Sequence, residues 1–255
     1  ERWSWIWAGA FIALGLSVVV SFFVKEEAVK PVEEKVDILK SLKQMIALIK
    51  TEKWLRRVIL VQLITSAASA TFSFFILRAG DVLPQTDEIL GYFLILQSIG
   101  TAIAALVGGL VIDHVGSWAS IRLAVIMQVC ALVAVTLAGV TSIPLILYSA
   151  AYICLGYVTS AFYWSFSTYL MDIADEQTRP IYLASSGVLV SITAINSLIA
   201  GALFEAFAPE AIFAGAAILA MVGVVLASTL RKGIALRKTA QGQAVAKGAA
   251  TSQSG

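Results

Sequence analysis

Seven stretches of this chain contain no Asp, Glu, Lys or Arg, and each is about as long as a bilayer-crossing helix. They cover residues 3–24, 58–77, 89–112, 123–140, 143–171, 181–204 and 211–230. An α-helix needs ~20 residues to cross ~30 Å of hydrocarbon, and a charged side chain at its centre costs roughly 2.5–3.5 kcal/mol. The pattern predicts an all-α polytopic membrane protein with seven transmembrane helices.

Composition excludes a soluble globular domain. Apolar residues make up 59% of the chain and charged residues 13%, against ~45–50% and ~25% in soluble domains. The net charge of +2 is a sum over separate loops, so it does not indicate a nucleic-acid partner. Cys130 and Cys154 lie within spans, as small buried side chains do. His114 is the only histidine and lies in a loop, so we expect no metal and no cofactor.

The basic residues predict the topology. Sixteen of the eighteen Lys and Arg residues fall on alternate loops, nine of them in residues 25–57. The others on that side are Arg122, Arg179 and five residues of the tail, whereas the opposite side has Arg2 and Arg78. Because basic loops stay in the cytoplasm, we expect an outside N-terminus and a cytoplasmic C-terminus, in the plasma membrane (the inner membrane of a bacterium).

The first span does not resemble a signal peptide, because its lysine follows the apolar run instead of preceding it. The chain also begins with Glu1 rather than Met. Seven spans with an outside N-terminus and no leader suggest a fragment whose earlier spans lie upstream.

An amphipathic helix is predicted in the long basic loop. Its apolar residues recur at helical spacing and share one face: Ile38, Leu39, Leu42, Met45, Ile46 and Ile49. This face either enters the headgroup boundary of the inner leaflet or packs on the inner ends of neighbouring spans. Residues 231–255 are rich in Ala, Gly, Gln and Ser, which predicts a disordered cytoplasmic tail.

The last six spans divide into two triplets. In each triplet the first two helices contain several Ser, Thr, Asn or Gln residues and the third contains two. Polar helices suit a bundle interior and apolar ones a lipid-facing position. The second helix of each triplet also ends in Gly-x-x-x-acid, at Gly109–Asp113 and Gly201–Glu205. By the predicted topology these ends lie on opposite sides, as two inverted three-helix repeats require.

One segment carries a resemblance to a known family. The third span ends in Gly108-Gly109-Leu110-Val111-Ile112-Asp113-His114-Val115-Gly116. This segment resembles the inner-loop signature of the major facilitator superfamily, G-x-x-x-D-[RK]-x-G-[RK]-[RK], and matches it at Gly109, Asp113 and Gly116. It departs at His114, Ser117 and Trp118, where the family prefers basic residues. That family carries a weaker copy of the signature between its eighth and ninth helices, after a long basic loop.

The resemblance implies a domain organisation and a function. Residues 1–24 correspond to the sixth helix, 25–57 to a cytoplasmic linker with the amphipathic helix, 58–230 to the six-helix C-terminal half, and 231–255 to the tail. The implied function is secondary transport of a small solute by alternating access, without enzymatic activity. The implied partners are the lipid bilayer, a small-molecule solute and the missing N-terminal half of the transporter, and no nucleic acid.

The signature loop gates the inner side of the cavity in that family. The resemblance therefore implies that Asp113 stabilises the outward-open state, while Gly109 and Gly116 permit close helix approach and a tight turn. The alternative is that Asp113 caps the following helix.

Polar side chains at helical spacing are candidates for the solute cavity. In the second span Gln62, Ser66, Ser69 and Ser73 form one stripe. Elsewhere the candidates are Gln97, Thr101, Tyr152, Thr159, Tyr163, Trp164, Thr193 and Asn196. An aromatic, hydroxyl-rich lining without charge suits a neutral or amphipathic solute. The alternative for each residue is a hydrogen bond between helices, worth ~0.6 kcal/mol.

Three rival classes of membrane protein fit this sequence less well. A retinal photoreceptor needs a lysine within a span, and a seven-helix receptor does not predict two triplets. A membrane enzyme needs a cluster of His, Asp, Glu or Cys at a common depth. Proton coupling needs an ionisable group at membrane depth, and the candidate, Glu205, lies four residues before Pro209 near the end of its span.

Overall fold

The computed structural model describes residues 11, 12, 15, 16, 19, 38–83, 87–175 and 178–231. The chain forms two compact units, Glu1–Asp37 and Ile38–Gly255. In the first unit the five described positions are helical and exposed. The rest of the predicted first span, residues 25–37 of the linker and the tail after Arg231 lie outside the described residues.

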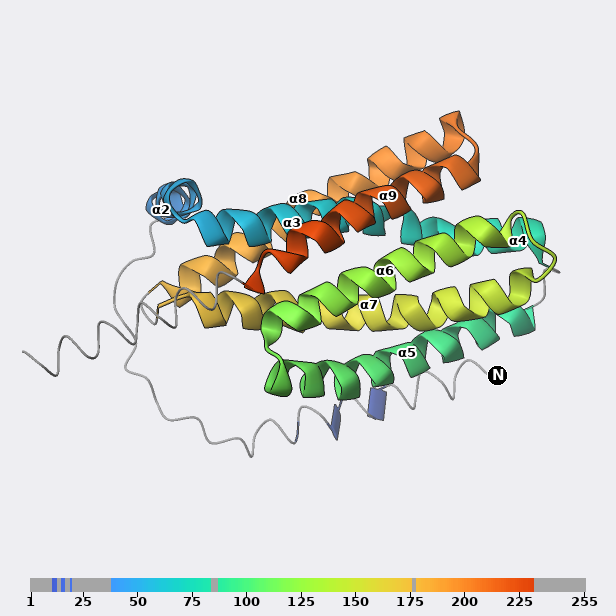
Figure 1. Cartoon of the computed structure of the whole chain (residues 1–255), viewed down its shortest axis with the longest axis horizontal. Coiled ribbons are helices and arrows are strands. Elements are labelled where there is room, and N and C mark those ends of the chain that lie inside the picture. The colour runs from blue at the N-terminus through green and yellow to red at the C-terminus, as the bar shows by residue number, and fades with distance from the viewer. Residues whose placement is uncertain are drawn as a thin grey trace, which may run out of the picture. The chain divides into compact units, whose positions relative to one another are not determined.

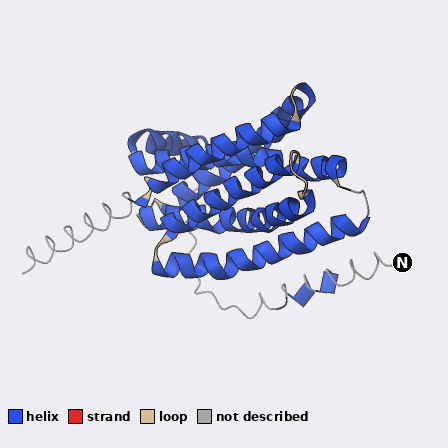
Figure 2. Cartoon of the chain, turned by 45° about the vertical axis from the view of Figure 1, so that its right-hand side comes forward, coloured by secondary structure: helices blue, strands red, loops and turns tan. Residues whose placement is uncertain are grey.

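The second unit is a bundle of long helices (Figure 1). In chain order its elements are α2 (Ile38–Thr51), α3 (Lys53–Ser69), the 3₁₀-helix η1 (Ala70–Phe74), α4 (Phe75–Val82), α5 (Asp87–His114), α6 (Ser117–Ala138), α7 (Pro144–Ile173), α8 (Arg179–Ala206) and α9 (Pro209–Ser228). Where the connections are described, they are short loops (Figure 2). Figure 1 shows α2 end-on, whereas the other helices run across the view, so α2 lies across one end of the bundle.

Among the residues that the structure describes, five helices are long and apolar enough to cross a membrane by length and composition. They are Lys53–Val82, which joins α3, η1 and α4, and Glu88–His114, Ser117–Ala138, Pro144–Ile173 and Pro209–Ser228. In α8, where several side chains are not described, the apolar segment Ile195–Ala206 is shorter. These helices confirm the predicted class, an all-α polytopic membrane protein.

Proline and glycine define several helix boundaries. Pro144, Pro180 and Pro209 stand in the first turn of α7, α8 and α9, where the missing N–H needs no partner. Gly116 separates α5 from α6 with φ 114°, a conformation that favours glycine. Its N–H donates to the Val111 carbonyl over 3.1 Å. The tight turn expected at Gly116 is therefore present.

Helix contacts follow the symmetry of an inverted repeat. The helix α3 packs on α8 and α9, α7 packs on α5 and α6, and α6 packs on α9. Exchange the triplet α3–α5–α6 with the triplet α7–α8–α9. The contact of α3 with α8 then becomes that of α7 with α5, the contact of α3 with α9 becomes that of α7 with α6, and the α6–α9 contact is unchanged. This pattern is the one that two inverted three-helix repeats produce.

Two glycines bring α5 and α7 into backbone contact. A Cβ at Gly100 would lie 2.0 Å from the Ile153 carbonyl oxygen, and one at Gly156 would lie 1.9 Å from that of Gln97. Small residues allow this approach between membrane helices, where close packing replaces the hydrophobic driving force. In the equivalent pair, the first described span (α3 with η1) and α8, side chains make the contact: the rings of Phe74 in η1 and Phe204 stack with centroids 4.1 Å apart.

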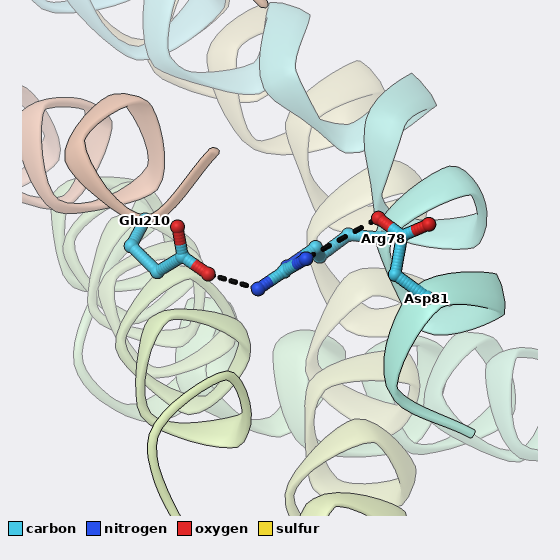
Figure 3. Close-up of polar contacts among 3 residues, drawn as sticks. All are labelled: Arg78, Asp81 and Glu210. Atoms are coloured by element: carbon cyan, nitrogen blue, oxygen red, sulfur yellow. Dashed lines mark hydrogen bonds and ion pairs between the residues drawn. The ribbon is translucent and has the colours of Figure 1, made fainter. Parts of the chain in front are cut away.

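A polar junction closes the end of the bundle where α4 ends, which we call the α4 end. Arg78 of α4 forms ion pairs with Glu210, in the first turn of α9, and with Asp81 at 3.2 Å (Figure 3). The Arg78 and Glu210 side chains are 20% and 33% exposed, whereas Asp81 is 62% exposed. A Cβ at Gly139, the C-cap of α6, would lie 2.9 Å from the Glu210 Oε1 atom, so three helix ends meet here.

The opposite end, which we call the α2 end, has an equivalent junction. Buried Ser117, the first residue of α6, donates a hydrogen bond to Asp172 in the last turn of α7. The Tyr169 hydroxyl donates to the Leu230 carbonyl after α9 over 3.1 Å. Arg231 lies 5.3 Å above the Trp118 ring. Under the triplet exchange this junction corresponds to the one at Arg78. Here the start of α6 is bonded to the end of α7, and there the start of α9 is bonded to α4, so each junction links the two triplets.

The charge asymmetry of the loops is present in the described helices. Lys43, Lys50 and Arg57 lie in α2 and the start of α3. Arg122 lies in the second turn of α6 and Arg179 is the first residue of α8. All of these helix ends are at the α2 end of the bundle (Figure 1). Arg78 lies at the α4 end. The side of the membrane that each end faces remains a prediction.

Gly100 provides the first test of this packing. We expect Gly100→Ala to destabilise the bundle by about 1–3 kcal/mol, because the added methyl group meets the α7 backbone and overpacks the contact. The matched control is Gly91→Ala on the same helix, where a Cβ meets nothing within 4 Å. Thermal unfolding in detergent measures both, and an equal melting temperature for the two variants would contradict this account of the contact.

The junction at Arg78 provides a second test. A double-mutant cycle of Arg78→Gln and Glu210→Gln is expected to give a coupling free energy of about 1 kcal/mol, because both side chains are partly buried. Asp81→Asn is the control. Its carboxylate is exposed, so its coupling to Arg78 should fall near the lower end of the ~0–1 kcal/mol of surface pairs. Equal couplings from unfolding curves would show that burial of the Glu210 pair has no effect.

Candidate functional site

A cavity of about 830 Å³ lies beside α3 and η1, with α7 and α8 completing its described walls. Its lining combines hydroxyl groups, one carboxamide and aromatic rings. The residues are Gln62, Thr65, Ser66, Ser69, Ala70, Phe72, Val158, Thr159, Phe162, Tyr163, Phe166, Ser167, Met171, Leu183, Ser186, Gly187 and Ser197. None of them carries a formal charge.

The polar wall comes from α3 and is held to α8. The Nε2 atom of Gln62 donates to the Ser186 Oγ atom over 3.0 Å, and that Oγ atom lies 3.1 Å from the Gln62 Oε1 atom. Gln62 is 6% exposed and Ser186 8% exposed. Each group thus has a partner without water, as buried polar groups require, and the carboxamide keeps a fixed orientation at the cavity wall.

A second glutamine supports this wall from behind. Gln128 of α6 is fully buried, and its Nε2 atom donates to the Thr65 carbonyl over 2.8 Å and to the Ser69 Oγ atom over 2.9 Å. Its Oε1 atom has no hydrogen-bond partner in the described part of the chain. The amide therefore fixes the Ser69 hydroxyl, which lines the cavity. The apolar composition of α6 favoured a lipid-facing helix, but this side chain faces the interior.

The opposite wall is aromatic and comes mainly from α7. Phe162 and Phe166 pack edge to face with centroids 5.7 Å apart, and Tyr163 is 79% exposed on the open side of the cavity. The Thr159 hydroxyl donates to the Leu155 carbonyl over 3.0 Å, and Ser167 donates to the Tyr163 carbonyl over 2.9 Å. Since these hydroxyls donate to their own helix, they offer a ligand their acceptor lone pairs.

The 3₁₀-helix η1 separates this cavity from a second one of about 400 Å³. Ala70 and Phe72 line the first cavity, whereas Thr71 lines the second together with Asn196. The Thr71 hydroxyl donates to the Ala68 carbonyl over 2.8 Å, which satisfies one acceptor where the α-helical pattern ends. The 3₁₀ segment that interrupts the α-helix therefore forms part of the wall of both cavities.

Five of the predicted cavity residues line the large cavity: Gln62, Ser66, Ser69, Thr159 and Tyr163. Asn196 lies in the smaller cavity, whose lining is otherwise apolar except for Thr71. The Thr193 side chain is outside the described residues. Ser73, the last member of the predicted α3 stripe, is exposed and does not line the cavity, where Phe72 is found instead.

The remaining four candidates lie at the contact between α5 and α7. The Tyr152 ring stacks on Phe93 with centroids 4.4 Å apart, and the Thr101 hydroxyl donates to the Gly156 carbonyl over 3.2 Å. The Gln97 backbone meets Gly156, and the Trp164 ring occupies the space beside Gly108. The Thr101 hydroxyl thus makes a hydrogen bond between helices, the alternative that the sequence left open, while Tyr152, Trp164 and the Gln97 backbone contribute to helix packing.

Several lining residues were not among the candidates, although the sequence contains a signal for some of them. Phe162 and Phe166 follow Thr159 at i+3 and i+7, which places them on the face of a candidate. Ser186 and Ser197 are eleven residues apart on one face of α8. Gln128, which supports the wall from behind, had no such signal, because it is one of two polar residues in the apolar stretch 123–140.

The signature loop lies at the α2 end, away from the cavity lining. Gly108 rather than Gly109 is the glycine that packing requires: a Cβ at Gly108 would lie 2.0 Å from the Trp164 ring, whereas one at Gly109 would meet nothing within 4 Å. Asp113 and His114 are exposed. Asp113 forms no ion pair with another described residue, so its role as a gate remains a prediction.

Thiol labelling tests the cavity. In a variant without Cys130 and Cys154, we expect Ser66→Cys to react with a small hydrophilic thiol reagent, because Ser66 lines the open cavity. Ser165→Cys is the control, since Ser165 is fully buried and hydrogen-bonded to Ser120 at 2.8 Å. Labelling rates from mass spectrometry should differ by at least an order of magnitude, and similar rates would contradict an open cavity at Ser66.

Comparison with known proteins identifies the family. Within the described residues, no three His, Cys, Asp or Glu side chains are grouped so that they could hold a metal ion. A search of the curated proteins returns no significant match, nor does a search of the solved structures. The family model described as Major Facilitator Superfamily matches residues 2–194, well over half of the chain. The chain belongs to the Major Facilitator Superfamily of membrane transporters.

Proposed function

We propose that this protein is a secondary active transporter that moves a small neutral, amphipathic solute by alternating access. The observation that carries the proposal is the uncharged cavity, with a polar wall on α3 and an aromatic wall on α7. Its volume of about 830 Å³ lies within the ~300–1,000 Å³ of small-molecule sites.

The chemistry of the two walls favours an amphipathic solute. Gln62 and Ser186 offer hydrogen bonds at fixed positions, while Phe162, Phe166 and Tyr163 offer ring faces and edges. A charged solute would lose its hydration without gaining a counter-ion from these walls, which is costly. A neutral molecule with one apolar ring system and one or two polar groups can satisfy both walls.

The open side of the cavity favours a second six-helix half as its partner. Tyr163 is 79% exposed, and Thr159 and Ser197 are also exposed. Polar lining of this kind suits a water-filled path or a protein interface better than lipid. In our proposal residues 58–230 form the C-terminal half and residues 1–24 belong to the other half. Residues 25–57 then form the linker between them, and residues 231–255 form a tail.

Alternating access requires each half to move as a unit while the other half rocks against it. The junctions at Arg78–Glu210 and Ser117–Asp172 tie the triplets together at both ends, which supports rigid-body movement. Asp113 lies exposed at the α2 end, so a group on the second half can reach it. We place the α2 end and the C-terminus in the cytoplasm, on the positive-inside rule.

Transport by a Gln62 variant tests this function. In the full transporter, Gln62→Leu should weaken binding of neutral aromatic amphiphiles by about 1 kcal/mol, roughly five-fold, because one oriented hydrogen-bonding group is lost. A competition assay with a fluorescent neutral amphiphile in proteoliposomes measures this loss. The control is Ser165→Ala, which removes a buried hydroxyl that does not line the cavity.

Two results would refute the proposal. One is unchanged transport by both Gln62→Leu and Phe166→Ala when their melting temperatures match the native protein. The other is a preference for permanently charged probes over neutral ones of similar shape.

A further inference from the structure

The helix α2 presents two different faces. Leu48 and Ile49 pack against the buried cluster at the α2 end of the bundle, and α2 contacts α3 and α8. Lys43, Ile46, Ala47 and Lys50 are exposed. Their spacing of i, i+3, i+4 and i+7 places them on one side of the helix, and Ile46 is 49% exposed. We call these four residues the exposed face of α2.

The helix α2 lies at the end of the bundle, where the spans would leave the membrane. The helix lies across the end of the bundle, at a large angle to the spans (Figure 1). A single residue, Glu52, joins it to α3, with φ −88° and ψ 104°. Trp54, in the first turn of that span, packs against Arg57 at 4.7 Å, and tryptophan is enriched near the membrane–water boundary. A helix held in this orientation runs along the bilayer surface.

The composition of the face determines its partner. The sequence of α2 contains three lysines and no acidic residue. On the exposed face Ile46 stands between Lys43 and Lys50, an arrangement in which an apolar side chain enters the headgroup boundary while flanking lysines reach phosphate groups. Basic segments next to a span are attracted to anionic lipids, and Arg122 and Arg179 lie at the same end. Charge complementarity thus favours an anionic leaflet over a protein partner.

We propose that the exposed face of α2 binds the headgroups of anionic phospholipids in the leaflet at the α2 end. The surface needs only that the bundle spans a bilayer, so it does not depend on the solute. Because Glu52 alone separates α2 from α3, lipid binding also fixes the start of the helix that carries Gln62, Ser66 and Ser69.

A depth measurement in defined bilayers tests the surface. The full chain without Cys130 and Cys154 carries a nitroxide at Ala47→Cys, next to Ile46 on the exposed face. It is placed in nanodiscs of phosphatidylcholine alone or mixed with phosphatidylglycerol. With the anionic lipid we expect the label to collide more with oxygen than with a water-soluble nickel chelate, and we expect the reverse in phosphatidylcholine alone. High salt should weaken the difference, since the attraction is electrostatic.

Lysine variants separate this surface from a general effect of charge. Lys43→Gln with Lys50→Gln should abolish the dependence on anionic lipid, and both side chains are exposed, so the fold is retained. The matched control, Lys238→Gln with Lys247→Gln, removes the same charge from outside α2 and should leave the dependence intact. A label at Ser142→Cys, in the exposed turn between α6 and α7, should not respond to lipid charge.

Three results would overturn the proposal. A label in water in both bilayers would mean that the face meets solvent or protein, and one at lipid depth in both would mean that only Ile46 and its apolar neighbours matter. An unchanged response in the double lysine variant would assign the anionic lipid to other basic residues.

Discussion

The contact between α5 and α7 is the constraint on which the rest of the bundle depends. In hydrocarbon, apolar side chains gain nothing by leaving lipid for protein, so association relies on close packing and a few hydrogen bonds. Gly100 and Gly156 allow the two backbones to touch. That contact fixes α7, and α7 in turn positions Thr159, Phe162 and Tyr163 along the cavity. By the symmetry of the repeat, α3 and α8 are the equivalent pair, and they meet through side chains instead of touching backbones.

The difference between the two equivalent pairs explains where the cavity forms. Between α5 and α7 the small residues leave no space, and Trp164 fills the room beside Gly108. Between α3 and α8 the Gln62–Ser186 hydrogen bonds hold the helices at side-chain distance. Because the α3 and α8 backbones stay apart, the polar wall on α3 can face the open side of the cavity. The same fold repeated twice thus gives one tightly packed pair and one pair that borders the cavity.

Sequence periodicity predicted the class, the described helices and part of the cavity lining because each depends on local spacing. The uncharged stretches at 58–77 and 89–112 lie within helices that the structure describes. The stripe of Gln62, Ser66 and Ser69 lines the cavity because α3 is regular over those residues. Spacing could not show whether Tyr152 and Trp164 face a cavity or a neighbouring helix, since that depends on partners far away in the chain. Gln128 was missed for the same reason: its role comes from contacts with Thr65 and Ser69 on another helix.

The 3₁₀-helix η1, within the span Lys53–Val82, affects which residues of the sequence face the cavity. A 3₁₀-helix turns ~120° per residue and an α-helix ~100°, so five residues of η1 advance the following side chains by about 100°. Ser73, which a continuous α-helix would align with Gln62 and Ser69, moves out of the stripe, and Phe72 lies at the cavity instead. The polarity of the wall therefore depends on the local winding of the backbone as well as on residue identity. Rewinding those five residues as α-helix would exchange a phenyl ring for a hydroxyl at that end of the cavity, with no change in sequence.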